Sequence, residues 1–488
     1  MAGAVAPLRT DGDGDSIASC SRSLECGHGD ALVASPLSVR QEMGAILAMA
    51  APLGFSAAAR NLQEVIVAVM LGRYETILLA AVATSAIWTS ITDVMLFQGL
   101  TQLSTLCSQT YGSNNLPLVG IWLQLFLVFA TLAAVPISFL RLWTDPILRA
   151  FGIPGDVAAM AGIYTRWATV ALFFDLWYGA VKEFYAAQKV VRPDAVIDAV
   201  LLVVNMGAVY CFVVWAQWGV VGAALAKSVI SFARLVVYVG FCHFMQYHRG
   251  TWNGWSWREI WVWERWRTLL VLTLPAALGG LVEELQFEVC LILAGQLGAV
   301  VSAAFSLLIN ILLIVCTLGM CIGDATGIHM ANALGAGNAT GARFVTRVGM
   351  WTTCLCGIVF GAITFMGLTS CLSMFSNDLA VQHELSEARW EMPACTIILF
   401  VFIPLVTVIL KQGRGHIVGT VVPLSCWGAG FPISYWLRGS RGMAGIIDGL
   451  IVGYSVAMAF LAMALSWSDW PALTTHARRN AEANAALQ

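Results

Sequence analysis

The chain has 488 residues, of which 59% are hydrophobic and only 11% are charged, and its mean hydropathy is +0.78. A soluble domain needs far more polar surface, so this composition indicates an integral membrane protein. The net charge of −2 excludes the strongly basic surface of a nucleic-acid-binding protein. Thirteen cysteines are scattered without metal-ligand spacing, and the sequence therefore predicts no metal site and no cofactor.

The amino-terminal segment, residues 1–42, is polar and rich in Gly, Ser and Asp. It lacks the basic start, short apolar core and cleavage site of a secretory signal. Too few apolar residues are present to form a core, so we expect a disordered tail.

Twelve mostly apolar runs follow, each of roughly 18 residues or more, which suffices to cross ~30 Å of hydrocarbon as a helix. The alternating ten-residue segments of a membrane barrel are absent from the sequence. We therefore expect an all-α membrane protein with twelve transmembrane helices. They are Gly44 to Leu71, Ile77 to Leu106, Val119 to Phe139, Arg166 to Tyr185, Ala195 to Trp218, Val220 to Phe244, Leu269 to Leu293, Val300 to Ile322, Val345 to Leu372, Pro393 to Leu410, Ile417 to Trp436 and Met443 to Trp467.

The distribution of Lys and Arg predicts the orientation of these helices. If the amino terminus is inside, most Lys and Arg residues outside the spans fall in inside segments. The positive-inside rule then places both termini in the cytoplasm, including a second tail at residues 468–488. We expect the plasma membrane or a vacuolar membrane as the location.

An internal repeat is visible at a constant offset along the chain. The interval from Gly112 in "SQTYGSNN" to Gly335 in "ANALGAGN" equals the interval from Pro52 to Pro275. Two further matches share this repeat offset: Arg166-Trp167 with Arg389-Trp390, and Gly219 and Gly222 with Gly442 and Gly445. One register over this length indicates an internal duplication.

The repeated unit contains six helices, and an even number returns the chain to its starting side. The two halves should therefore be parallel repeats related by a pseudo-two-fold axis along the membrane normal, as in many secondary transporters. We predict an N-lobe at residues 43–247 (helices 1–6) and a C-lobe at residues 267–467 (helices 7–12), with a cleft between them.

Residues 248–266 join the two predicted lobes and are rich in Trp. Ser256 and Glu259 have the spacing of a capping box. Because Trp rings favour the depth of the lipid headgroups, we expect a helix that lies at the cytoplasmic interface.

Four segments together resemble one known family: "TLCSQTYGSNNLPLVGIWLQ", "GTWNGWSW", "LPAALGGLVEELQFEV" and "NALGAGNATGAR". At these residues the chain resembles the multidrug and toxic compound extrusion (MATE) family, most of all its eukaryotic branch. The resemblance covers roughly residues 44–467. It implies a two-lobed antiporter of twelve helices that exports amphipathic organic compounds, often cations, against an inward flow of protons or sodium.

Three carboxylates, Glu283, Glu284 and Glu288, lie inside the apolar run from Leu269 to Leu293. On insertion scales each costs about 2.5 to 3.5 kcal/mol at a bilayer centre, so a functional site facing a wet cleft is favoured over packing in lipid. On an ideal helix Glu284 and Glu288 lie about 40° apart, whereas Glu283 and Glu288 diverge by about 140°.

The family resemblance selects a different pair from helix geometry. Its helix 7 carries the pattern E-x-x-x-x-E, which falls on Glu283 and Glu288. Both arguments include Glu288, so it ranks first as a proton- and substrate-coupling residue, followed by Glu283 and Glu284. A carboxylate can hold either a proton or a cationic substrate, and competition between them would exchange one for the other while the lobes alternate.

One acid of the resembled branch is missing. Its helix 10 position falls on Phe400, and Asp175 lies near the repeat-equivalent place in the other lobe. We therefore include Asp175 as a fourth coupling residue. Weaker candidates are the other acids in or near spans: Glu64, Asp93, Asp198 and Asp324. Arg60, four residues before Glu64, is expected to pair with it along the helix.

These observations favour a proton-coupled exporter of organic cations or other amphipathic drug-like solutes, acting as a monomer in the lipid bilayer. A sodium-coupled exporter or a lipid-linked oligosaccharide flippase of the same superfamily is the alternative. A channel would need a pore-lining segment or charge rings, and a receptor normally lacks a two-part repeat. No nucleophile motif or His cluster marks an enzyme.

Overall fold

The computed structural model describes residues 38–370 and 378–485, which form helices joined by short loops. The long helices are α2 (Val39–Tyr74), α3 (Thr76–Gly112), α4 (Leu116–Leu142), α6 (Gly155–Ala187), α7 (Arg192–Val209) with the π-helix η2 (Tyr210–Trp215), α8 (Gly219–Phe244), α10 (Trp263–Leu297), α11 (Ala299–Gly335), α12 (Ala339–Ser370), α15 (Glu391–Lys411), α16 (Gly415–Ser425) with the π-helix η3 (Cys426–Gly430), and α17 (Phe431–Ser466). The shorter helices are α5 (Thr144–Ala150), α9 (Trp257–Ile260), α14 (Leu379–Glu387) and α18 (Trp470–Ala485).

Within the described residues, eleven helical stretches are long and apolar enough to cross a membrane. The last one, Gly415–Ser466, has 52 residues and folds back on itself. Gly442 there has φ 57° and ψ −133°, a conformation outside the helical region that glycine adopts readily. Ser434 Oγ donates to the carbonyl oxygen of Ile446 at 2.9 Å, so the segments on either side of Gly442 run antiparallel. This turn divides the stretch into two spans and gives the twelve predicted.

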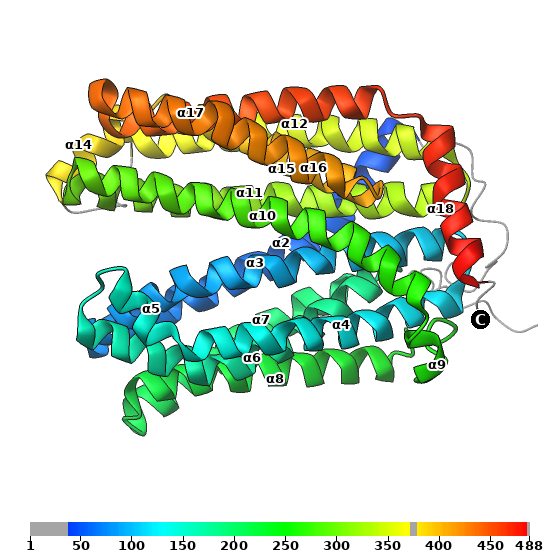
Figure 1. Ribbon diagram of the computed structural model, residues 1–488, viewed down its shortest axis with the longest axis horizontal. Helices are drawn as coiled ribbons and strands as arrows, with labels where there is room; N and C mark the ends of the chain where they lie inside the picture. Colours follow the sequence, from blue (N-terminus) through cyan, green and yellow to red (C-terminus); the bar gives the residue numbers. More distant parts are fainter. Residues whose placement is uncertain (1–37, 371–377, 486–488) are drawn as a thin grey trace, which may run out of the picture. The chain divides into compact units, whose positions relative to one another are not determined.

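The helices pack in two groups, as the ribbon shows (Figure 1). We call α2 to α8 the N-lobe and α10 to α17 the C-lobe. The lobes meet where α3 contacts α10 and α11, and where α2 contacts α11. The described residues from Ser38 onward form one compact unit, so the division at residues 247 and 267 stays a prediction.

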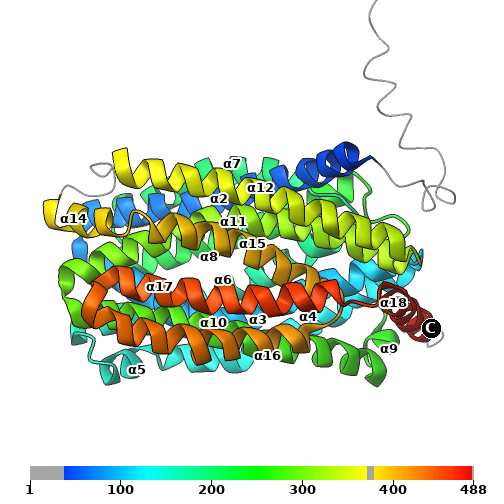
Figure 2. The same ribbon diagram turned by 90° about the horizontal axis from the view of Figure 1, so that it is seen from above.

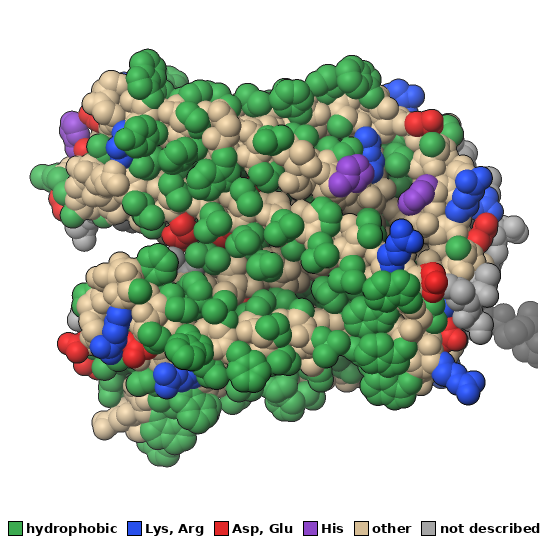
Figure 3. Space-filling model, viewed as in Figure 1, with side chains coloured by type: hydrophobic (Ala, Val, Ile, Leu, Met, Phe, Trp, Pro, Cys, Tyr) green, Lys and Arg blue, Asp and Glu red, His purple; other side chains and the backbone are tan. Residues whose placement is uncertain are grey.

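The unit has two distinct ends. In both ribbon views α5 and α14 lie at one end, and α9 and α18 lie at the other (Figures 1 and 2). The space-filling view shows an opening between the lobes at the α5/α14 end, whereas side chains fill the gap toward the α9/α18 end (Figure 3). The two lobes are therefore separated at one end and joined at the other.

Two glycines allow the inner helices to meet at the closed end. A Cβ on Gly112 of α3 would lie 2.1 Å from the carbonyl oxygen of Asn332, and one on Gly335 of α11 would lie 1.9 Å from that of Gln109. Gln109 and Asn332 are related by the same repeat offset as Gly112 and Gly335. Each helix thus makes the same contact with the other, as a two-fold axis requires.

The two terminal segments differ in how much the structure describes. Residues 1–37 of the predicted disordered tail lie outside the described residues. The prediction is wrong for residues 38–42, because α2 begins at Val39 and Ser38 caps it by accepting a hydrogen bond from the backbone N–H of Gln41 at 3.3 Å. At the other terminus, α18 packs on α3 and α4 of the N-lobe and on α11 and α12 of the C-lobe.

The prediction of an interfacial helix between the lobes is wrong. Within residues 248–266 the helical parts are Trp257–Ile260 and the first turn of α10 from Trp263, and Gly250 and Gly254 adopt φ of 85° and 93°, which interrupt a helix before them. Gln124 of α4 holds this linker instead: its Nε2 donates to the carbonyl oxygen of Gly254 at 2.7 Å.

The predicted capping box is not formed either. The side chain of Ser256 makes no cap hydrogen bond. The carboxylate of Glu259 accepts a hydrogen bond from Arg265 at 2.7 Å, and Arg265 also donates to the carbonyl oxygen of Asn484 in α18. Glu259 therefore helps to join the linker to α10 and α18.

The glycine crossing can be tested by adding single methyl groups. Gly112→Ala and Gly335→Ala should each lower the free energy of unfolding by about 1 to 3 kcal/mol, the range for overpacking, because the new Cβ meets backbone atoms that cannot rotate away. The thermal midpoint of purified protein in detergent measures this. Gly240→Ala on α8 is the matched control, since its Cβ meets nothing within 4 Å. Equal midpoints for all three variants would contradict the crossing.

Candidate functional site

The three acids of α10 lie beside the seam between the lobes. Gly280 of α10 faces the side chain of Gln98 on α3, so this face of α10 points to the N-lobe. Glu284 follows one turn later and lies about 40° from Gly280 on an ideal helix. From Gly280 the helix runs on toward Leu297 and away from the α9 end, so Glu283, Glu284 and Glu288 lie in the half of α10 nearer the opening (Figure 1).

All three carboxylates are half-buried. Among the described residues, no ion pair includes Glu283, Glu284 or Glu288, although the same chain forms ion pairs in both lobes. Glu284 lies within electrostatic range of Glu283 and of Glu288. The α10 acids therefore form one group of negative charges that no cationic side chain in the described part of the chain balances.

Two hydrogen bonds to η3 fix the part of α10 that carries the acids. Trp427 Nε1 donates to the carbonyl oxygen of Val282 at 3.0 Å, and Gln286 Nε2 donates to that of Cys426 at 3.3 Å. Glu283 lies near the fully buried side chain of Tyr454 in α17, whose hydroxyl forms no hydrogen bond with any described residue. A π-helical segment of this kind is frequent at functional sites, because it breaks the regular bonding of a helix.

Phe400, at the place of the missing helix 10 acid, lies in a packed apolar contact. Its side chain is fully buried, and its ring stacks on Phe360 with centroids 5.4 Å apart. A Cβ on Gly319 of α11 would lie 3.2 Å from the ring, so α11 packs directly against it. An acid here would have no open space, and the position carries no polar function.

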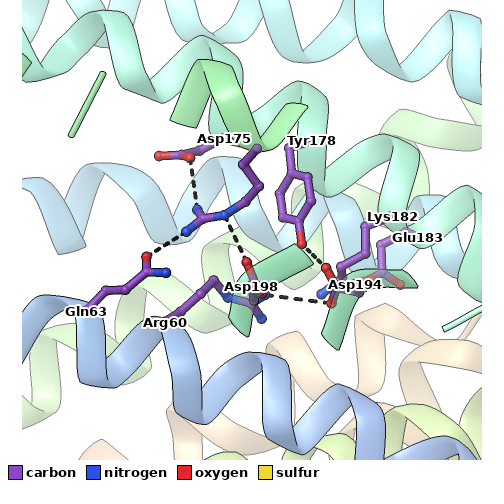
Figure 4. Close-up of polar contacts among 9 residues, drawn as sticks. Arg60, Gln63, Asp175, Tyr178, Lys182, Glu183, Asp194 and Asp198 are labelled. Carbon is purple, nitrogen blue, oxygen red and sulfur yellow. Dashed lines mark hydrogen bonds and ion pairs between the residues drawn. The ribbon is translucent and has the colours of Figure 1, made fainter. Parts of the chain in front are cut away.

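The N-lobe contains a different arrangement, in which acids and guanidinium groups alternate (Figure 4). Arg60 of α2 lies 2.6 Å from Asp198 and 3.7 Å from Asp194 of α7. Arg234 of α8 lies 3.1 Å from Asp198 and 3.8 Å from Asp175 of α6. The predicted acids Asp175 and Asp198 are thus brought together, but through arginines that balance their charge.

The expected pair of Arg60 and Glu64 is wrong. The guanidinium of Arg60 turns to the α7 carboxylates, and Glu64 is exposed and forms no ion pair with any described residue. The physical reason is burial: Asp198 is fully buried and must be balanced by a cation, whereas an exposed Glu64 gains little from one. Asp198 lies 138 residues from Arg60, beyond the reach of a helix-neighbour rule.

The remaining secondary acids are also paired. Asp93 of α3 accepts a hydrogen bond from Arg141 of α4. Asp324 of α11 lies 3.6 Å from Lys411 of α15. No hydrogen bond or ion pair among the described residues joins Asp93 or Asp324 to Glu283, Glu284 or Glu288.

Reasoning from the sequence misses several polar residues at the seam. Lys411 follows an apolar run and reads as a loop residue, yet its side chain is fully buried and Nζ donates to Ser104 Oγ of α3 at 2.8 Å. Gln109 of α3 also donates to the carbonyl oxygen of Lys411 at 3.1 Å. Lys182 and Glu183 of α6 face the same seam, where they line a cavity with α2 and α11. In the sequence, the one feature that points to these residues is that they are charged and directly adjoin apolar runs.

A comparison with known protein families identifies the family of this chain. Residues 52–211 and 275–436, more than half of the chain, both match the profile of the family MatE. The chain belongs to the MatE family. The two matches start at residues 52 and 275, which are separated by the repeat offset, so each lobe of this MatE protein is one copy of the same unit. Membership of this transporter family confirms the predictions of a family resemblance and of a transporter rather than an enzyme.

Relatives of this MatE protein occur in animals and plants. It is 29% identical to multidrug and toxin extrusion protein 1 of Rattus norvegicus over 322 residues, which cover 66% of this chain but only 56% of that protein. The chain thus spans just over half the length of this animal relative. It is 24% identical to protein DETOXIFICATION 36 of Arabidopsis thaliana, covering 88% of this chain and 86% of the relative.

Solved structures share the fold. The crystal structure of the eukaryotic MATE transporter AtDTX14 superposes with a TM-score of 0.85 at 23% identity, covering 91% of this chain and 99% of that one. A mutant of the Vibrio cholerae MATE transporter VcmN gives 0.82 at 17% identity, covering 89% and 99%. These likenesses confirm the all-helical membrane fold.

The N-lobe network can be tested through its central acid. Asp198→Asn should lower the free energy of unfolding by about 3 to 5 kcal/mol, because it removes the buried carboxylate nearest to both guanidinium groups and leaves Arg60 and Arg234 with only their more distant partners, Asp194 at 3.7 Å and Asp175 at 3.8 Å. Thermal unfolding in detergent measures the loss. Glu64→Gln is the matched control and should unfold like the wild type, since that acid is exposed. A wild-type midpoint for Asp198→Asn would refute a structural role for the network.

Proposed function

We propose that this protein is a secondary antiporter that exports organic cations or other amphipathic drug-like solutes in exchange for protons. The names of its relatives support the substrate class, since they describe multidrug and toxin extrusion. Protons are proposed as the coupling ion, and the plasma membrane or a vacuolar membrane as the location. Both termini, and with them the α9/α18 end, are proposed to face the cytoplasm.

The contrast between the two lobes carries this proposal. In the N-lobe the acids Asp175, Asp194 and Asp198 share two guanidinium groups. In the C-lobe the three α10 acids have no cationic partner among the described residues and lie near the opening. Holding such charge near a bilayer centre is costly, and a hydrated site that binds a cation or a proton offsets that cost.

Exchange follows from competition for the same carboxylates. A protonated carboxyl group has little attraction for an organic cation, and a bound cation disfavours protonation. Because Glu283, Glu284 and Glu288 interact with one another, they should bind protons as a coupled set. Protons that enter from outside would release the cation there, and loss of the protons inside would restore the binding form.

We assign different parts to the acids. Glu288, toward the open end of α10, is proposed to make the first contact with the substrate. Glu284 is proposed to contact the same substrate at the seam. Glu283, beside Tyr454, is proposed to link protonation to the packing of α17. Asp175 is proposed as a secondary coupling acid, because it is half-buried and its contact with Arg234 is long, at 3.8 Å.

Alternating access requires the joined end to open in turn. With α5 and α14 outside, the opening in Figure 3 corresponds to an outward-facing state. The inward-facing state would separate α3 from α11 at the glycine crossing and break the bonds of Lys411 to Ser104 and Gln109. The two lobes would then rock about the seam, as in other transporters built from repeats.

Glu288→Gln should reduce exchange to the level of protein-free liposomes, because an amide can neither take up a proton nor balance a cation. The measurement is uptake of a radiolabelled organic cation, tetraethylammonium, into proteoliposomes under an imposed pH gradient. Glu387→Gln, an acid of α14 with 56% side-chain exposure, is the control and should transport normally.

Protein abundance and the thermal midpoint of Glu288→Gln should stay near those of the wild type. If folded protein is lost instead, Glu288 has a structural role and the assignment fails. Full exchange by Glu288→Gln would likewise exclude it from the coupling set.

The coupling ion can be determined in the same proteoliposomes. A pH gradient without sodium should drive tetraethylammonium movement, and a sodium gradient at equal pH on both sides should not, because the proposed site holds protons. Initial rates under the two gradients are compared, with a protonophore to collapse the first. Movement under the sodium gradient alone would replace the proton assignment by the sodium-coupled alternative.

A further inference from the structure

A polar cavity lies at the seam between α2, α6 and α11, and none of its lining residues belongs to α10. It has a volume of about 210 Å³ and is lined by both lobes. Six lining residues are polar or charged: Arg60, Asn61, Lys182, Glu183, Thr317 and Asp324. The rest of the lining is apolar apart from Cys321. The proposed exchange mechanism does not use this cavity.

The polar groups of the cavity are incompletely satisfied by the protein. Lys182 Nζ lies 3.6 Å from Glu183, and Asp324 lies 3.6 Å from Lys411, both beyond ordinary hydrogen-bond distance. Within the described part of the chain, the side chains of Asn61 and Glu183 make no hydrogen bond. The side chains of Lys182 and Glu183 are half-buried, with exposures of 20% and 15%, so their free donors and acceptors can bind a ligand that enters the cavity.

The charges of the lining are balanced. Arg60 and Lys182 contribute two positive charges, and Glu183 and Asp324 contribute two negative charges. Arg60 and Asp324 also have partners outside the lining, Asp198 and Lys411, and this exchange of one negative and one positive charge keeps the balance. A cation would be repelled by the first pair and an anion by the second. A small molecule with both an acidic and a basic group can contact both pairs, with its carboxylate at Lys182 and its ammonium at Asp324, without adding net charge.

The internal repeat gives independent support. Arg60 and Asn61 occupy the positions that Glu283 and Glu284 occupy in the C-lobe, at the repeat offset. The contact of α2 with α11 likewise corresponds to that of α10 with α3. The seam proposed to bind a cation therefore has a counterpart across the two-fold axis, with different side chains and a cavity of its own.

We propose that this cavity is a second binding site, for a small zwitterion that carries one carboxylate and one ammonium group. A volume of 210 Å³ corresponds to about seven water molecules at ~30 Å³ each, which fits a compound of amino-acid size rather than a drug-sized one. Because α2 and α6 belong to one lobe and α11 to the other, the bound zwitterion holds the lobes in the arrangement described here. The site does not depend on the proposed exchange function.

The test uses three compounds of similar size that differ in charge: 4-aminobutanoate (zwitterion), pentanoate (anion) and 4-amino-1-butanol (cation). A ligand that binds only the folded state raises the thermal midpoint with concentration. For purified full-length protein in detergent, 4-aminobutanoate should raise the midpoint at about tenfold lower concentration than either control. Equal effects of the three compounds, or no effect of 4-aminobutanoate, would overturn the proposal.

Two neighbouring variants on α6 test the charge balance without relying on loss of binding alone. Lys182→Gln leaves an excess negative charge, so 4-amino-1-butanol should become the preferred compound. Glu183→Gln leaves an excess positive charge, so pentanoate should become preferred. An unchanged preference in both folded variants would contradict a site at this cavity.

Glu288→Gln separates this site from the proposed exchange site. It should bind 4-aminobutanoate like the wild type while losing cation exchange. If it loses zwitterion binding as well, the compound binds at the α10 acids and the second site does not exist.

Discussion

The approach of α3 and α11 at Gly112 and Gly335 is the contact on which the arrangement of the lobes depends. Each glycine lies against a backbone carbonyl of the other helix, so closely that a Cβ at this position would clash with the carbonyl oxygen. Both helices have 37 residues, far more than the ~20 that span a bilayer. Because they meet in their last turn, they can diverge toward the other end, where the opening lies (Figure 3). The glycine crossing therefore joins the lobes at one end and leaves room for the opening at the other.

The two lobes differ in whether cationic side chains balance their acidic residues. In the N-lobe, Arg60 and Arg234 hold three carboxylates of α6 and α7 together, so removing one charge leaves others unbalanced. That arrangement favours a rigid lobe. In the C-lobe, the acids of α10 have no cationic partner among the described residues, and under the proposed exchange the charge of this site changes with its occupant. A rigid half and a half with a variable charge are suited to rocking against each other, since only one side must respond to the ligand.

Much of the fold could be predicted from the sequence, because it follows from local properties. Long apolar runs predict spans, and the constant offset between matching glycines predicts the repeat, which the two family matches confirm. Long-range pairing could not be predicted. Arg60 has Glu64 as its helical neighbour but bonds to Asp198, and Lys411 follows an apolar run yet is buried against the other lobe. Such partners depend on how helices pack, which spacing along one helix does not contain.

The repeat constrains backbone more strongly than side chains. Gly219 and Gly442, one offset apart, both have positive φ, and the glycine crossing is reciprocal, so the turns and close contacts of the two lobes remain alike. At the same offset Arg60 corresponds to Glu283, a reversal of charge within equivalent helices. Substitution at a seam-facing position changes what binds there but leaves helix packing intact, whereas any side chain at Gly112 or Gly335 would separate the lobes. Duplication therefore supplied two similar seams, and charge substitution could give them different ligands without disturbing the motion they share.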